Sequence, residues 1–138
     1  MKIVKKITNL LLKNGYSIVK LKKVRTGHVI CKGLVNEING KFILDTGASH
    51  TCIGLEYEKY FCLLSESSDE LAASASDENI KTKQSSENFF EIGSIKKKQN
   101  FVLISLQTVN SALSKQKVKP VHGIIGSDFL EETKAVID

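Results

Sequence analysis

Apolar residues near the start of the chain recur at helical spacing, and lysines fill many of the positions between them. The recurring apolar positions are Val4, Ile7, Leu10 and Leu11. They fall on one face of a helix, and Asn14-Gly15 is a natural place for that helix to end. The pattern therefore predicts an N-terminal helix over residues 1–14.

The next part of the chain alternates apolar and polar residues, which is typical of β-strands. Strands are expected over residues 16–24 and 28–38, with Arg25-Thr26-Gly27 as the turn between them. Asn39-Gly40 then stands between two apolar runs, and this is the strongest short signal for a β-hairpin. Asp45 is therefore expected at the end of the strand that leaves this hairpin.

The second half of the chain contains a long alternating segment at residues 87–106. This segment predicts two strands around Gly93 and a turn at Lys96–Lys98. Residues 107–117 are expected to be irregular or briefly helical. A mainly β fold follows from the number of alternating segments.

The last stretch predicts a short helix from Ser127 to about Glu132, followed by a final strand. Ser127 or Asp128 is the expected N-cap, because both side chains can accept hydrogen bonds from free backbone N–H groups. A length of 138 residues is ordinary for one domain, so residues 1–138 are expected to form one unit.

Composition limits the classes of function. Hydrophobic residues make up 41% and charged residues 25%, as in an ordinary globular protein. No apolar run approaches the ~20 residues that cross a bilayer, so no membrane partner is expected. Cys31, Cys52 and Cys62 form an odd set without a C-x-x-C pair. We therefore expect no disulfide framework, no metal site and no cofactor.

Positive charge is concentrated at the N-terminus. Residues 1–25 carry eight Lys or Arg and no acid, which leaves the rest of the chain at net −3. No nucleic-acid motif accompanies these lysines, so a solvated helix face and strand edge are favoured over a nucleic-acid partner. The start resembles a signal peptide, but Lys13 follows the short Leu run at once and no small-residue cleavage site appears. A cytoplasmic location is therefore expected.

Two glycine-containing motifs carry the candidate chemistry. The first is "FILDTGAS", in which a run of bulky apolar residues ends at Asp45 and only small residues follow. Alone, Asp45-Thr46-Gly47 is compatible with an ordinary turn after a strand. The second motif is Ile124-Ile125-Gly126, an apolar pair with a glycine that again precedes a predicted helix. The two motifs in this order are much rarer than either one.

With both motifs present, the chain resembles the retropepsin-like aspartic proteases, in particular single-domain bacterial members. "ILDTGAS" is similar to the catalytic strand and turn of that family, and "GIIGSDFL" to the strand that passes beneath the catalytic loop. The resemblance extends loosely over residues 12–138. It implies a closed β-barrel or sandwich with one short C-terminal helix, to which the sequence pattern adds an N-terminal helix.

The resemblance implies an endopeptidase that uses two carboxylates sharing one proton to hydrolyse a peptide bond with water. The chain has only one Asp-Thr-Gly, so the second carboxylate is expected from Asp45 of another copy in a homodimer. Burial of Asp45 would then be offset by its partner and by backbone donors. Thr46 is expected to bond across the two-fold axis, Gly47 to permit the turn, and Ala48 to leave room for a peptide or protein substrate.

The same resemblance implies a hairpin flap over the substrate, which by position falls within residues 68–80. Its candidate tip is Ala73, Ser74, Ala75 and Ser76, which has no glycine. The main alternative function is therefore a non-catalytic module of the same fold that binds peptides or dimerises. A Cys52–His50 nucleophile pair is disfavoured because no third group orients it, and His122 is expected to be structural.

Overall fold

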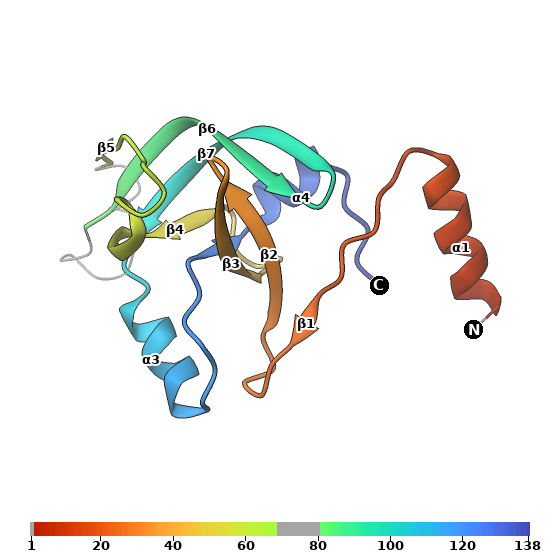
Figure 1. Ribbon diagram of the computed structural model, residues 1–138, viewed down its shortest axis with the longest axis horizontal. Helices are drawn as coiled ribbons and strands as arrows, with labels where there is room; N and C mark the ends of the chain where they lie inside the picture. The colour runs from red at the N-terminus through yellow and green to blue at the C-terminus, as the bar shows by residue number, and fades with distance from the viewer. Residues whose placement is uncertain (1, 69–80) are drawn as a thin grey trace.

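The computed structural model describes residues 2–68 and 81–138, and its elements are shown in Figure 1. In chain order they are α1 (Lys2–Lys13), β1 (Lys22–Lys23), β2 (Val29–Val35), β3 (Ile38–Leu44), β4 (Cys52–Gly54), the 3₁₀ helix η1 (Leu55–Tyr57), β5 (Glu66–Ser67), β6 (Lys83–Ile92), β7 (Ile95–Ile104), α3 (Gln107–Lys115), β8 (Gly123–Ile125) and α4 (Ser127–Glu132). The predicted mainly β fold is confirmed, as are its N-terminal helix and its short C-terminal helix.

The strands form one sheet that closes on itself. Their order is β1-β2-β3-β8-β4-β7-β6-β5, and an additional pairing joins β2 to β6. Six strands from β2 to β6 in that order therefore make a closed barrel (Figure 1). Closure leaves these six strands with no free edge to pair with other chains.

Aromatic side chains fill the barrel. Phe42, Phe61, Phe90 and Phe101 are almost completely buried, and Phe129 of α4 packs against them. Phe90 is central, because its ring lies 5.0 Å from both Phe42 and Phe129 and 5.4 Å from Phe101. Burying each such side chain contributes about 2–3 kcal/mol. The barrel is therefore held by a packed aromatic core that reaches α4.

A second, smaller core lies under α3. It joins Leu113 of this helix to Ile30, Ile43 and Val121. Asn110 fixes the chain that follows, because its side chain bonds both the N–H and the carbonyl of Val121, at 2.8 and 3.0 Å. Residues 107–115, expected to be at most briefly helical, are thus a helix that holds the approach to β8.

The hairpin between β2 and β3 turns at Asn36-Glu37, so the prediction of a turn at Asn39-Gly40 is wrong. Asn36 and Glu37 both have positive φ, 49° and 69°, as a two-residue hairpin turn requires. Asn36 also donates to the carbonyl of Phe61 at 3.2 Å and accepts from Phe89 N at 3.0 Å. Gly40 lies inside β3, where a Cβ would come within 2.9 Å of the rings of Phe42 and Phe61.

Three other local predictions are also wrong. The hairpin between β6 and β7 turns at Gly93-Ser94, and Lys96–Lys98 belong to β7, paired with residues 89–91. Of residues 16–24 only Lys22–Lys23 form a strand, and they pair with Ile30 and Val29 of β2. The final strand is absent, because Lys134 takes a left-handed conformation (φ 53°) and Ala135 N bonds back to Leu130 O at 2.9 Å.

Helix α1 lies apart from the barrel, and none of its residues is buried (Figure 1). The segment after it returns to the barrel through Tyr16, whose hydroxyl donates to Lys134 O at 3.1 Å. Within the part of the chain that the structure describes, no helix combines the length and apolar character needed to span a membrane.

Candidate active site

The barrel brings the two sequence motifs together through three strands. β8 pairs in parallel with β3, so that Leu44 faces Ile125, and antiparallel with β4, so that Ile124 faces Cys52. β8 therefore lies between the two strands that flank the loop at residues 45–51. The Ile124-Ile125-Gly126 motif thus lies directly against the Asp-Thr-Gly loop.

Gly126 allows this close approach. A Cβ at Gly126 would lie 2.7 Å from the carbonyl carbon and oxygen of His50 and 2.8 Å from Ala48 O. The residue after it, Ser127, donates its N–H to Ala48 O at 2.7 Å. Because these neighbouring atoms belong to the backbone, no change of a side-chain rotamer would make room for a Cβ at Gly126.

Asp45 follows the last residue of β3 and is fixed from both sides. Its N–H donates to Ile125 O at 3.0 Å, and its own carbonyl accepts from Ala48 N at 3.2 Å. The carboxylate oxygen Oδ1 accepts from Gly47 N at 2.9 Å. Asp45, Thr46 and Gly47 are exposed and Ala48 is partly buried. The expected burial of Asp45 is therefore not found in a single chain.

A buried polar network supports the far end of this loop. Thr51 is completely buried, and its hydroxyl donates to Asp128 Oδ1 at 2.6 Å while accepting from Gly126 N at 3.1 Å. Asp128 Oδ2 accepts from Gln99 Nε2 at 3.0 Å. One hydroxyl thus ties the end of the loop to the glycine of the second motif and to α4.

The sequence pattern gave no role to Thr51 and Gln99 and predicted only a capping role for Asp128. The N-cap of α4 is Gly126, so neither Ser127 nor Asp128 occupies the predicted N-cap position. Asp128 Oδ1 does accept a first-turn backbone N–H, that of Phe129 at 2.8 Å, and the same carboxylate also bonds Thr51 and Gln99. A polar residue directly before the apolar run "CIG" was the available signal for Thr51, because such a residue needs a partner when buried.

Comparison with known proteins agrees with this geometry. The profile of the family described as "Aspartyl protease" matches residues 31–129, which include both motifs. The chain belongs to this family. No curated protein sequence matches the chain.

Solved structures show the same fold. The EIAV protease in complex with the inhibitor HBY-793 is 15% identical with a TM-score of 0.58, and the match covers 89% of this chain and 97% of that one. A retropepsin-like aspartic protease from Rickettsia conorii is 20% identical with a TM-score of 0.56, over 89% and 90% of the two chains. The retroviral protease-like domain of Ddi1 from Leishmania major is 12% identical with a TM-score of 0.56, over 88% and 83%. The fold of this aspartyl protease family member is therefore retropepsin-like.

Cys52 is unsuited to act as a nucleophile beside the loop. Burial, with the negative charges of Asp128 and Asp45, raises the pKa of the Cys52 thiol to about 11. Its Sγ donates to the carbonyl of His50, and the His50 ring contacts Ser49 Oγ at 3.0 Å. A protonated thiol is a poor nucleophile at neutral pH, so the structure argues against a cysteine mechanism.

His122 has the structural surroundings that the sequence suggested. Its Nδ1 accepts the N–H of Lys41 at 3.0 Å, and its own backbone N–H donates to Lys41 O at 2.8 Å. The ring packs on Tyr57, Tyr60 and Phe61. Burial, followed by the charge of Lys41, lowers the pKa of His122. This histidine links β3 to the segment before β8.

The candidate flap tip at Ala73–Ser76 lies outside the described residues. The chain on either side of residues 69–80 is joined, because Ser68 N donates to Thr82 O at 3.1 Å and Thr82 Oγ1 donates to Ser68 O at 2.8 Å. Across residues 2–68 and 81–138, no three His, Cys, Asp or Glu side chains gather closely enough to hold a metal ion.

Proposed function

We propose that the protein is an aspartic endopeptidase whose active site forms between two copies of the chain. The observation that carries this proposal is the state of Asp45. Its backbone and one carboxylate oxygen are fixed by Ile125 O and Gly47 N, while the residue itself remains exposed. A carboxylate held in this way at the end of a barrel strand is positioned for reaction and needs a partner.

In the proposed dimer, Asp45 of each copy supplies one carboxylate of the pair. The ionised carboxylate takes a proton from water, and the water oxygen attacks the peptide carbonyl carbon. The protonated carboxyl donates its proton to the carbonyl oxygen. The carboxyl that took the proton from water then gives it to the nitrogen, the C–N bond of the tetrahedral intermediate breaks, and the other carboxylate takes a proton back from a hydroxyl of the intermediate. The products are one new carboxylate and one new amine.

The residues beside Asp45 have distinct proposed roles. The exposed Thr46 hydroxyl is placed to bond with the partner's loop across the two-fold axis. Gly47 directs its N–H at Asp45 Oδ1. Ala48 offers a small side chain where an extended peptide or protein substrate would pass. The cytoplasmic location and the absence of a nucleic-acid partner stay predictions from the sequence.

Asp45→Asn tests the role of the carboxylate. The amide keeps the size of the side chain and an oxygen that can accept from Gly47 N, but it cannot exchange the proton. We expect the variant to fold with an unchanged circular dichroism spectrum and to hydrolyse a protein substrate at least about a thousandfold more slowly. Full activity of this variant would refute an aspartic mechanism at this residue.

A tandem fusion tests the shared site. Two copies are joined by a flexible linker, one half intact and the other carrying Asp45→Asn, and the fusion with two intact halves is the control. Because each site needs one Asp45 from each half, the mixed fusion should be nearly inactive. Mixing equal amounts of separate wild-type and Asp45→Asn chains should leave about a quarter of the sites intact. A mixed fusion that keeps about half the control activity would show that each copy works alone.

A further inference from the structure

Helix α1 is strongly amphipathic, yet it contributes nothing to the core. Five of its apolar residues share one side, within an arc of about 120° at 3.6 residues per turn. They are Ile3, Val4, Ile7, Leu10 and Leu11, and this set is called the apolar stripe. Ile3 is 73% exposed and Leu10 is 61% exposed. Lysines at positions 2, 5, 6 and 13 occupy the opposite side.

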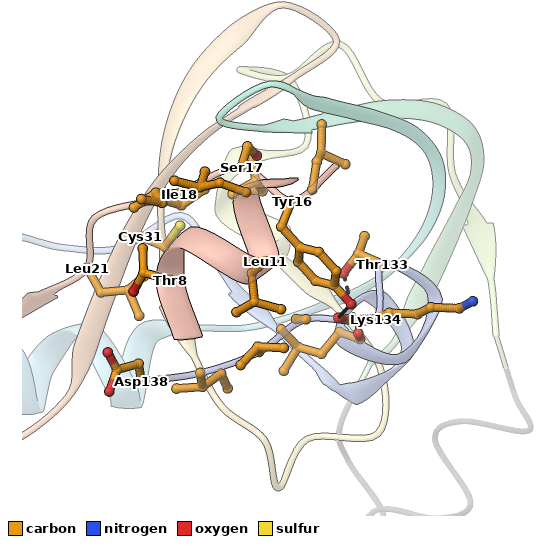
Figure 2. A pocket seen from close by; sticks show the side chains of 18 of the residues that line it. Thr8, Leu11, Tyr16, Ser17, Ile18, Leu21, Cys31, Thr133, Lys134 and Asp138 are labelled. Carbon is orange, nitrogen blue, oxygen red and sulfur yellow. Dashed lines mark hydrogen bonds between the residues drawn. The ribbon is translucent and has the colours of Figure 1, made fainter. Parts of the chain in front are cut away.

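The apolar stripe continues into a groove between α1 and the barrel (Figure 2). The groove has a volume of about 810 Å³, and its apolar lining includes Val4, Ile7, Leu11 and Leu12 of α1, Ile18 and Leu21 of the following segment, and Val136 and Ile137 near the other end of the chain. Ile18 is 61% exposed and Val136 is 56% exposed. An exposed apolar area of this kind marks a site of association.

Charge decides which partner fits this surface. Residues 1–25 carry eight Lys or Arg and no acid. A second copy packed on this surface would bring a second set of the same positive charges close to the first, which is repulsive. Nucleic acid would satisfy the lysines but would leave the apolar stripe in water. An anionic bilayer satisfies both, because headgroups attract the lysines while the acyl boundary accepts the apolar side chains.

We propose that α1 lies in the plane of an anionic membrane surface and holds the barrel against it. The apolar stripe enters the boundary between headgroups and acyl chains, and the lysines of α1 remain at headgroup level. The expectation of no membrane partner rested on spanning segments alone, and in-plane binding needs none. This proposal is independent of the catalytic one, so Asp45→Asn should bind membranes as the wild-type chain does.

Vesicle flotation of the full chain tests the proposal. Vesicles of phosphatidylcholine alone are compared with vesicles that also contain about one-third phosphatidylglycerol. We expect the chain to float with the anionic vesicles and to remain behind with the neutral ones. Binding should weaken steeply with salt, because headgroup attraction is screened within a Debye length of about 10 Å at 0.1 M ionic strength.

Leu10→Gln and Leu64→Gln form a matched pair of exposed leucines. Leu10 belongs to the apolar stripe, whereas Leu64, 89% exposed, lies outside both α1 and the groove. Leu10→Gln should weaken vesicle binding about tenfold, as expected for losing one buried leucine. Leu64→Gln should stay within about twofold of wild type. Since neither side chain is buried, both variants should unfold at the wild-type temperature.

Lysine variants test the charge. Lys5→Gln with Lys6→Gln should weaken binding about fivefold per lysine. Lys115→Gln with Lys117→Gln removes the same charge from the region of α3 and should have little effect. Equal binding to neutral vesicles, or equal loss in both lysine pairs, would overturn the proposal. So would sedimentation showing that Leu10→Gln dissociates a wild-type dimer while neither protein floats, because the apolar stripe would then belong to a second copy.

Discussion

Gly47 and Gly126 lie near the same loop but meet different atoms. A Cβ at Gly126 would be 2.7–2.8 Å from backbone atoms of His50 and Ala48. A Cβ at Gly47 would be 3.2 Å from the Asp45 carboxylate oxygen Oδ1, on an exposed turn. Gly126 therefore controls whether the segment after β8 can lie against the loop at residues 45–51. Gly47 controls the direction in which the Asp45 carboxylate points.

Alanine at each position should separate these roles. Gly126→Ala should lower the free energy of unfolding by about 3 kcal/mol, because backbone must move to accept the methyl group. Gly47→Ala should change stability by less than about 1 kcal/mol but reduce kcat/KM by roughly tenfold to a hundredfold, as a displaced catalytic group does. Urea unfolding and peptidase assays measure the two effects. Equal losses of stability in both variants would contradict this division.

At the scale of elements, sequence predicted types better than boundaries. The strand before Asp45 and the helix after Gly126 were predictable, because their apolar runs end at residues with distinct local preferences. The β2–β3 turn was not. Asn39-Gly40 has the better turn composition, yet the turn forms at Asn36-Glu37 because Asn36 bonds to Phe61 and Phe89, which are distant in sequence. Gly40 is required by packing against two rings rather than by a turn.

The support of the candidate site was likewise beyond local reasoning. Thr51, Gln99 and Asp128 come from three separate parts of the chain, and only the closed barrel brings their side chains together. Asp45 and Gly126 could be identified because their neighbours in sequence form motifs. The exposure of Asp45 could not, since it depends on how the folded barrel presents the loop.

His122 joins β3 to the approach of β8 and makes this junction sensitive to pH. Burial, with the nearby charge of Lys41, lowers the pKa of His122 below its ordinary value of 6.5. As the pH falls below 6.5, the unfolded chain takes up a proton that the folded chain resists. The stability that neutral His122 contributes is therefore present above pH 6.5 and is lost as the pH falls toward the lower folded pKa.

Glutamine at this position should flatten the pH dependence. The side chain introduced by His122→Gln has an oxygen to accept the Lys41 N–H but does not titrate, so the loss of stability between pH 7 and pH 5 should be smaller. At pH 7 the variant should be less stable by about 1 kcal/mol, because contacts with Tyr57 and Tyr60 weaken. His28→Gln, which alters an exposed imidazole, is the matched control. If the urea midpoints of the wild type, His122→Gln and His28→Gln fell equally between pH 7 and pH 5, the pH dependence of stability would come from other groups.

At the scale of the whole molecule, the chain carries half of a proposed active site and an unevenly placed charge. The barrel presents one Asp45, and the basic helix lies apart from it (Figure 1). The proposed dimer and the proposed membrane surface involve different parts of the molecule. If a membrane concentrates the chains in two dimensions, it also favours pairing of the barrels by raising their effective concentration. Activity should therefore depend on how the chain is concentrated.

Both pH and protein concentration should control that activity. Specific activity should rise with protein concentration until the dimer is saturated, because a single chain lacks the second carboxylate. At saturation, kcat/KM should follow a bell-shaped curve with its maximum below neutral pH, since the carboxylate pair must hold one proton. A statine-type inhibitor should block the reaction.

The acid side of that curve has two contributions that one variant can separate. Protonation of both carboxylates removes the base, and unfolding linked to His122 removes active protein. His122→Gln should recover the second loss and leave the first, so its curve should keep an acid limb at an unchanged position once activity is normalised to folded protein. Cleavage that rises steadily to pH 9, at any protein concentration, would show that no shared proton is involved and that Asp45 acts by another mechanism.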